Sequence, residues 1–284
     1  MILIDYSGIS IAPIAMGAAH WSDENLIRHM ILNSIRMYRK RFGSKYGEVV
    51  VIGDNGGNWR KKVYPEYKGK RGLSREESKI DWDVAFSTIN KVFDELGEYF
   101  PYKTINQYGC EADDSIAEIV KWSQEFGNYE EIMIVSSDKD FKQLHKYSNV
   151  AQYSPITKKF ITVDNPRLEQ MEHFLKGDSG DGVPNVLSDD RVFVEGRRQV
   201  VLSAKKKALL MDDPKALGGD VYRNYIRNKK MIDLTEESEC PEVVRQEIIN
   251  TFVGQDRSKN RSKVFTYLVS HNCNLLIDCV GEFV

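Results

Sequence analysis

Val49-Val50-Val51-Ile52-Gly53-Asp54 is an apolar run that ends in an acid and is followed by turn residues. A short apolar run bounded in this way is typical of a buried parallel strand. Met1-Ile2-Leu3-Ile4-Asp5 repeats the pattern, and Asp138 and Asp140 follow a third such run at 131–137. A helical pattern at 26–38 separates the first two runs. The sequence therefore predicts an α/β fold with a mostly parallel sheet and acids at its carboxyl edge.

Three further acids, Glu111, Asp113 and Asp114, begin a helical pattern that continues to residue 126. The macrodipole and the free N–H groups of a helix N-terminus favour an anion, so one acid needs no further explanation there. Three acids within one turn repel each other, which raises their pKa values unless a multivalent cation compensates. Asp178 and Asp181 add two more acids in a glycine-rich loop.

Each of these acids alone is explained as a turn or cap residue, but together at one edge they would be destabilising without cations. Carboxylates with no Cys or His nearby favour Mg²⁺ or Mn²⁺ over Zn²⁺. Two such ions, roughly 3.5–4 Å apart, can activate water and stabilise the leaving oxygen of a phosphodiester. We therefore expect two-metal phosphodiester hydrolysis. The candidate acids are Asp5, Asp54, Glu111, Asp113, Asp114, Asp138, Asp140, Asp178 and Asp181.

A phosphomonoesterase with an aspartyl nucleophile is an alternative, because Asp138-Lys139-Asp140 superficially fits its motif. Such an enzyme needs far fewer carboxylates and leaves the segment 59–79 unexplained. That segment has eight Lys or Arg against three Glu, interleaved with Trp59, Tyr64 and Tyr67. Cations alternating with aromatic rings are expected where a protein grips phosphates and stacks the bases of a single strand. A solvated charged face, with Trp59 and Tyr64 as packing residues, is the simpler alternative.

The second half of the chain has a different composition. Residues 191–230 contain eleven Lys or Arg against four acids, including Lys205-Lys206-Lys207, and predict a helical, partly basic region. We expect a core at 1–184 and a mainly helical region at 185–284, with 264–269 and 275–280 packing back on the core.

Overall composition narrows the class of protein. With 284 residues, 29% charged and a net charge of −2, the chain is expected to fold into an enzyme-sized globular protein. It has no apolar run long enough to span a bilayer and no signal peptide, so we expect a cytoplasmic protein without membrane contact. The four cysteines form no CxxC pair and no set with zinc spacing. His29 and His145 are interpreted as packing residues, and a Walker-type phosphate loop is absent.

Several of these motifs occur in an order that resembles the flap-endonuclease, or structure-specific 5′ nuclease, family. The stretches 28–35 and 143–147 are similar to the ribonuclease H members of T-even bacteriophages. The resemblance is clear from residue 1 to about 184 and looser beyond. The motifs are Leu3-Ile4-Asp5-Tyr6-Ser7, Ile52-Gly53-Asp54-Asn55, Tyr64-Pro65-Glu66-Tyr67-Lys68-Gly69-Lys70-Arg71, Glu111-Ala112-Asp113-Asp114, Ser136-Ser137-Asp138-Lys139-Asp140-Phe141 and Gly177-Asp178-Ser179-Gly180-Asp181.

The resemblance implies a PIN-like nuclease core with a helical arch at about 59–80. It also implies a 5′-to-3′ exonuclease and flap endonuclease that acts on DNA and RNA–DNA hybrids and removes RNA primers from lagging-strand fragments. Two Mg²⁺ ions, for which Mn²⁺ can substitute, would bind the acids. The first would use Asp5, Asp54, Asp113 and Asp138, the second Glu111, Asp140, Asp178 and Asp181, and Asp114 would lie behind them.

The same resemblance places Lys68 and Arg71 on the scissile phosphate. Arg60, Lys61, Tyr64 and Tyr67 would contact nucleic acid from the arch, and Lys205, Lys206 and Lys207 would contact the duplex. A monomer is expected, with a single-strand-binding protein as a further partner. The family's Gly-x-Gly hairpin with its monovalent ion is missing at 185–190. T-even members carry an extension before the first strand that is linked to sliding-clamp contact, and because this chain starts at the strand, clamp contact is not implied. A non-cleaving flap- or junction-binding protein of the same fold is the alternative, and the intact acids argue against it.

Overall fold

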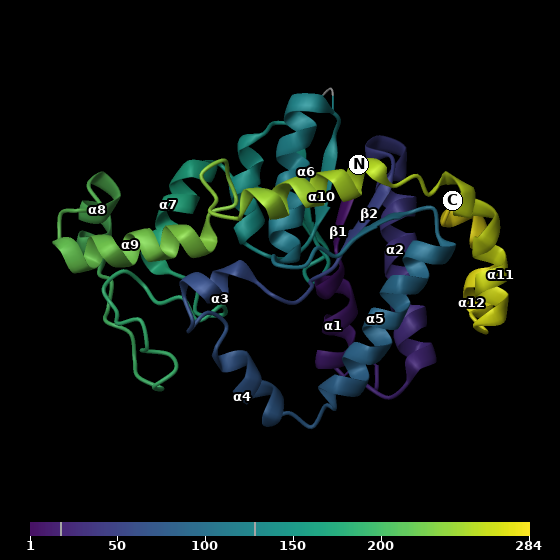
Figure 1. Cartoon of the computed structure of the whole chain (residues 1–284), viewed down its shortest axis with the longest axis horizontal. Coiled ribbons are helices and arrows are strands. Elements are labelled where there is room, and N and C mark those ends of the chain that lie inside the picture. Colours follow the sequence, from purple (N-terminus) through teal and green to yellow (C-terminus); the bar gives the residue numbers. More distant parts are fainter. Residues whose placement is uncertain (18, 128) are drawn as a thin grey trace.

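The computed structural model describes residues 1–17, 19–127 and 129–284. Its centre is a six-stranded sheet with the order β3-β2-β1-β4-β5-β6, in which β6 alone is antiparallel to its neighbour. The predicted α/β class with a mostly parallel sheet is confirmed (Figure 1). The strands are β1 Ile2–Asp5, β2 Val49–Ile52, β3 Lys103–Ile105, β4 Ile132–Val135, β5 Val150–Ser154 and β6 Lys159–Ile161.

Helices cover both faces of the sheet, because successive strand residues point to opposite sides. Ile2 and Ile4 of β1 belong to one apolar cluster, and Leu3 belongs to the other. The first cluster includes residues of α1 (Tyr6–Ala15), α2 (Glu24–Tyr46) and α5 (Trp82–Tyr99). The second includes residues of α6 (Ala112–Phe126), the 3₁₀ helix η1 (Asp140–Lys146), α7 (Pro166–Lys176) and α10 (Glu242–Gly254).

Two helix boundaries differ from what the residue types suggest. Ser7 and Gly8 suggest a loop after Asp5, but α1 begins at Tyr6 because the Asp5 carboxylate accepts a hydrogen bond from the Gly8 amide and caps the helix. Gly43 suggests a helix end, but α2 passes through it. The helix continues to Tyr46 and ends at Gly47, whose φ of 81° suits a glycine after a helix.

The basic segment forms two short helices, α3 (Trp59–Val63) and α4 (Lys70–Glu76). Figure 1 shows them as an arm that leaves the sheet near α6, passes below the core and returns through α5. Trp59 and Tyr64, at the start of this arm, are 4% and 5% exposed. The arm is therefore anchored in the core at its beginning and extends into solvent only beyond Tyr67.

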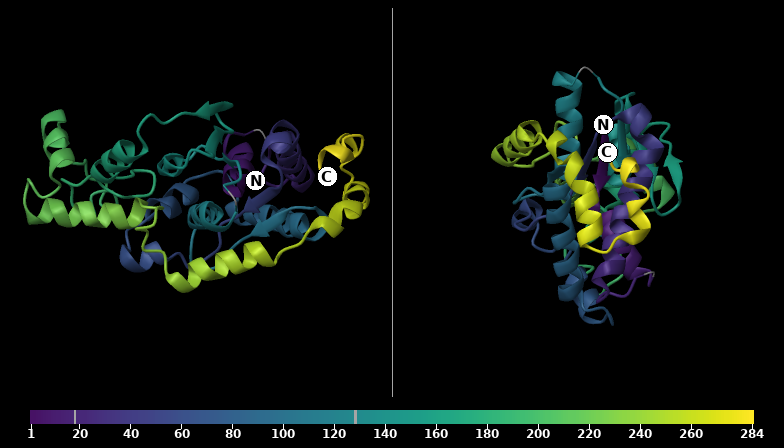
Figure 2. Two further views of the ribbon diagram at one scale, coloured as in Figure 1. Left: turned by 90° about the horizontal axis from the view of Figure 1, so that it is seen from above. Right: turned by 90° about the vertical axis from the view of Figure 1, so that its right-hand side faces the viewer.

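The C-terminal half lies along both ends of the core. Figure 2 shows α8 (Ala204–Asp212) and α9 (Gly219–Ile232) at one end, and α11 (Lys263–Ser270) and α12 (Asn274–Ile277) at the other. The last helices pack on the core, since Tyr267 and Leu276 belong to its first apolar cluster. The 3₁₀ helices η2 (Ser258–Ser262) and η3 (Val280–Glu282) flank them. Among the described helices, none is long and apolar enough to cross a membrane.

Candidate active site

Acids converge at the carboxyl edge of the parallel strands. Asp5 ends β1 and accepts a hydrogen bond of 2.8 Å from the Ser136 hydroxyl, which follows β4. Asp54 follows β2 and accepts hydrogen bonds from the Ser7 hydroxyl at 2.7 Å and from the amide of Ala112 at 2.8 Å. The amide bond places Asp54 at the N-terminus of α6. Parallel pairing of β1 with β2 and β4 thus brings three separate parts of the chain to one point.

The N-terminus of α6 adds the next acids. Glu111 is its cap residue, and Glu111 and Asp114 form a capping box in which the Asp114 carboxylate accepts from the Glu111 amide at 3.0 Å. Asp113, in the same turn, lies close enough to Asp138, Glu111 and Asp5 for their charges to act on it. Asp114 is directed inward and is 2% exposed.

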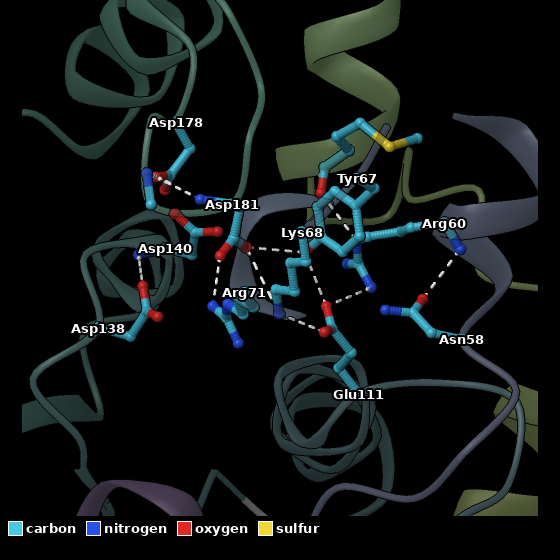
Figure 3. A network of polar contacts seen from close by, with 12 residues as sticks. Asn58, Arg60, Tyr67, Lys68, Arg71, Glu111, Asp138, Asp140, Asp178 and Asp181 are labelled. Atoms are coloured by element: carbon cyan, nitrogen blue, oxygen red, sulfur yellow. Dashed lines mark hydrogen bonds and ion pairs between the residues drawn. The ribbon is translucent and has the colours of Figure 1, made fainter. Parts of the chain in front are cut away.

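The remaining acids come from η1 and the loop after α7. Asp140 is 9% exposed, and its Oδ1 atom is buried without a hydrogen-bond partner. Asp178 is held by the amides of Gly180 at 2.9 Å and Asp181 at 3.3 Å. Figure 3 shows Asp138, Asp140, Asp178 and Asp181 grouped opposite Glu111, with cations between them.

The electrostatics of these acids indicate a shortage of positive charge. Burial, with the neighbouring Asp54 and Asp138 carboxylates, raises the pKa of Asp5 to about 6. Burial and adjacent acids likewise raise the pKa of Asp113, Asp138 and Asp140. Burial of Asp178 acts in the same direction, but contacts with His173 and Lys139 outweigh it and lower the pKa of that carboxyl.

A hard divalent cation fits this donor set. Buried carboxylates with raised pKa values would be stabilised as anions by a nearby multivalent ion, and oxygen ligands are those that such ions prefer. The unpartnered Asp140 Oδ1 atom is a ready ligand. The structure thus brings together all the acids that the sequence predicted, with Asp114 directed away from the shared edge.

Cations from the base of the arch lie against the acids. Lys68 pairs with Glu111 and lies 3.5 Å from Asp181, and Arg71 donates to Asp181 at 2.6 Å (Figure 3). The hydroxyl of Tyr67 donates to either Glu111 or Asp181, each 2.8 Å away. These contacts link the two groups of acids through the arch.

The backbone fixes Lys68 in this position. Its φ is 55°, a left-handed conformation that costs a non-glycine residue about 1–2 kcal/mol. The Lys68 amide donates to the Asp181 carbonyl at 2.7 Å. Gly182 lies against the same turn, where an added Cβ would be 3.2 Å from the Glu66 carbonyl oxygen. The arch base and the 178–182 loop therefore form one packed unit, and strain of this kind is typical of functional sites.

Three residues that are expected to contact nucleic acid, Arg60, Tyr64 and Tyr67, are buried. Arg60 is 2% exposed, and its guanidinium donates to both oxygens of Asp114, at 2.6 and 2.9 Å, and to the Met231 carbonyl. Tyr64 and Tyr67 are 5% and 2% exposed. These side chains are buried in the structure, and the contacts with nucleic acid that the sequence predicts for them stay predictions. The same side chains anchor the arch.

The other basic candidates lie on the surface. Lys61, Lys205 and Lys206 are exposed, and Lys207 is half-buried and pairs with Glu172. Sequence reasoning did not include His173, which contacts Asp140 and Asp178. A signal was present, because a helix from Pro166 that ends before Gly177 brings residue 173 close to the first acid after its C-terminus.

Carboxylates at the edge of a parallel sheet, in contact with cations from the base of the arch, define a metal-dependent phosphodiester hydrolase. A family model described as the N-terminal resolvase-like domain of 5′-3′ exonucleases matches residues 20–172, and one described as the C-terminal part of T4 RNase H matches 164–283. The chain is 34% identical to ribonuclease H of Enterobacteria phage T4 over 99% of its length and 95% of that protein. It therefore belongs to the 5′-3′ exonuclease family, whose members include the phage T4 ribonuclease H.

Solved structures show the same fold. The zinc-bound T5 5′-exonuclease matches with a TM-score of 0.63 at 18% identity, covering 89% of this chain and 98% of that one. A complex of the T5 flap endonuclease with DNA and metal ions matches with a TM-score of 0.60 at 20% identity, covering 91% and 95%.

The buried Arg60–Asp114 pair is expected to be a major contribution to stability. Replacing Arg60 by Met leaves the Asp114 charge buried and unpaired, so the free energy of unfolding should fall by about 3–5 kcal/mol. Adding Asp114→Asn removes that charge and should restore much of the loss. Urea unfolding of the three proteins measures both effects. Arg197→Ala, which breaks exposed ion pairs with Glu195 and Asp189, is the control and should change stability by less than about 1 kcal/mol. A similarly small effect of Arg60→Met would contradict the anchoring role.

Proposed function

We propose that this protein is a 5′-to-3′ exonuclease and flap endonuclease that uses two Mg²⁺ ions on DNA flaps, DNA ends and RNA–DNA hybrids. Removal of RNA primers during lagging-strand synthesis would be its role, in the cytoplasm of an infected bacterium if a phage encodes it. The observation that carries the proposal is the contact of arch cations with the acid edge, where Lys68 pairs with Glu111 and Arg71 with Asp181. Family membership supports the same chemistry.

The acids would divide between two ions. The first ion would be held by the acids around the end of β1, which are Asp5, Asp54, Asp113 and Asp138. These carboxylates are close enough to repel each other, because Asp138 raises the pKa of both Asp113 and Asp5. Glu111, Asp140, Asp178 and Asp181 would serve the second. When bound, the ions supply an activated water and stabilise the leaving oxygen. Asp114 contributes indirectly, because its bond to the Glu111 amide holds that ligand in place.

The protein's own cations would bind the reacting phosphate. The Lys68 ammonium is 14% exposed and the Arg71 side chain 49%, so both lie where the acids meet solvent. A phosphodiester at this point would compete with Glu111 and Asp181 for them. Charge developing on the phosphate would then be stabilised by groups whose positions the fold already fixes. Lys61, Lys205 and Lys206 would supply salt-dependent grip on the backbone beyond the site.

Loss of one ligand to the first ion tests the reaction. The Asp138→Asn variant should bind a labelled 5′-flap DNA with near wild-type affinity but release no detectable product in Mg²⁺. Wild-type protein should cleave the flap in Mg²⁺ and not in EDTA. The matched control is Asp278→Asn, an exposed acid in the C-terminal region. Tight binding by the wild type with no metal-dependent product would instead support a non-cleaving flap-binding protein.

Removal of either arch cation should slow the chemical step. We expect Lys68→Ala and Arg71→Ala each to reduce the single-turnover rate on the order of a hundredfold, the effect of losing one preorganised electrostatic group. Lys45→Ala, at the exposed C-terminal end of α2, is the control. If the rate stayed the same and only salt-dependent binding weakened, these residues would grip the substrate without acting on the reacting phosphate.

A further inference from the structure

His173 joins two of the acids through its two ring nitrogens. Its Nδ1 atom lies 3.3 Å from Asp140 Oδ1, and its Nε2 atom lies 3.5 Å from Asp178 Oδ2. Among the described residues, this trio is the one group whose ligand atoms all lie within 4.8 Å of each other. Such spacing suits direct ligands of a single ion, whose neighbouring donors are separated by a few ångströms.

Two atoms of the trio are buried and lack hydrogen-bond partners. They are Asp140 Oδ1, on a residue that is 9% exposed, and His173 Nε2. A buried polar atom without a partner is unusual in a folded protein and calls for a specific cause. An ion between these atoms would satisfy both.

The backbone also builds the site. The Gly177 amide donates to the His173 carbonyl at 2.8 Å and ends α7. Gly177 has a φ of 67°, and an added Cβ would lie 2.4 Å from the carbonyl oxygens of Val183 and Pro184. This tight turn returns the chain so that Asp178 lies beside His173. A cavity of about 460 Å³, whose lining includes Asp140, His173 and Gly177 together with Lys139, Lys142 and Lys176, adjoins the trio.

We propose that His173 is a ligand of the second metal ion, together with Asp140 and Asp178, and that this site therefore binds a first-row transition ion more tightly than Mg²⁺, although Mg²⁺ is sufficient for the cleavage proposed above. This inference rests on the metal-dependent nuclease proposed above and adds a nitrogen donor to it. Imidazole is a good ligand for Zn²⁺ and Co²⁺ and a better one for Mn²⁺ than for Mg²⁺, which favours oxygen ligands. Lys139 contacts Asp178 Oδ2 at 3.1 Å from an exposed position, so it can leave when the ion binds.

Metal binding by the intact protein tests this assignment without any measurement of activity. The wild type should bind Mn²⁺ in calorimetry, and Co²⁺ should give a visible absorption band from a site with a nitrogen ligand. The His173→Gln variant should lose roughly tenfold or more in affinity for one Mn²⁺ ion and lose part of the Co²⁺ band. Its Mg²⁺ affinity should change much less.

The control is His145→Gln, because His145 contacts Gln152 and not an acid. Equal or tighter Mn²⁺ binding by His173→Gln would overturn the inference. A histidine that only pairs with the two acids competes with the ion for them, so its removal would leave the acids free to bind Mn²⁺. Flap cleavage in Mg²⁺ by the wild type separates this result from the proposed function. If the wild type cleaves the flap and His173→Gln binds Mn²⁺ with unchanged affinity, only the role of His173 as a ligand is rejected.

A second and independent feature is Tyr108, on the loop between β3 and α6. The residue is 65% exposed, although the loop that carries it is firmly held. The Gly109 amide donates to the Gly56 carbonyl at 2.9 Å, and the Asn55 side chain donates to Asn106 at 2.6 Å. One of these two loops directly follows Asp54, and the other directly precedes Glu111, so both lie at the same edge of the sheet.

The ring of Tyr108 packs against the backbone of Gly56 and Gly57. A Cβ added to Gly57 would be 2.4 Å from the Tyr108 Cζ atom, and one added to Gly56 would be 3.6 Å from Cε2. Gly57 has a φ of 80°, which few other residues adopt. An exposed aromatic ring with a rigid support, on a loop that leads directly into the acids at the start of α6, is suited to stacking on a base. The geometry points to Tyr108 as a platform for a nucleobase of the substrate, a role that also rests on the proposed function.

Binding of a flap DNA with 2-aminopurine next to the scissile phosphodiester tests the platform. Wild type and Tyr108→Phe should quench the fluorescence equally, whereas Tyr108→Ala should lose the quenching and weaken binding roughly five- to hundredfold. Gly57→Ala, which displaces the ring, should have the same effect with the tyrosine present. Phe126→Ala is the control, because this exposed ring lies at the opposite end of α6.

Unchanged affinity and quenching in Tyr108→Ala would overturn this second inference. If the wild type still cleaved the flap in Mg²⁺, the failure would concern the platform and not the proposed function.

Discussion

Mutual repulsion among carboxylates is the constraint on which the structure depends. Parallel pairing of β1 with β2 and β4 delivers acids to one edge, and the N-terminus of α6 and the loop after α7 add more. Raised pKa values at Asp5 and Asp113 show that burial without enough positive charge opposes ionisation there. The protein supplies part of the missing charge through Lys68 and Arg71. The rest of the positive charge would come from bound metal ions, to which the acids remain available.

The arch can supply this charge only because its base is rigid. Arg60 joins three parts of the chain: the start of the arch, Asp114 behind the acids of the site, and the end of α9 through the Met231 carbonyl. Tyr64 adds a link to the 182–190 region through bonds to the carbonyls of Gly182 and Asp190. A guanidinium with a buried partner has little freedom, so the turn that carries Lys68 is held against the acids. The helix α4 beyond it is more exposed, and its contacts include the Arg71–Asp181 pair and the Arg75 guanidinium over the Phe86 ring.

Much of the fold and of the acid edge could be predicted because both follow from short-range pattern. Apolar runs that end in acids specify parallel strands, and parallel strands bring Asp5, Asp54 and Asp138 together. The differences came from long-range pairing and ambiguous turn residues. Ser7 and Gly8 suggest a loop, yet the Asp5 cap starts a helix there. Arg60 suggests an exposed contact by composition, because its partner Asp114 is 54 residues away and only the fold brings them together.

The same reasoning explains why His173 and Tyr108 were not found by pattern. A histidine in an amphipathic helix is usually a packing residue, and its meeting with Asp140 depends on the contact of α7 with η1 and on the turn at Gly177. Tyr108 gains its rigid support from glycines about 50 residues earlier in the sequence. The carboxylates are arranged by secondary structure and topology, whereas the groups expected to select the ion and to stack on a base are arranged by individual loop contacts. Ligand preference can therefore change between members of one fold through a few loop residues, while the acid edge stays the same.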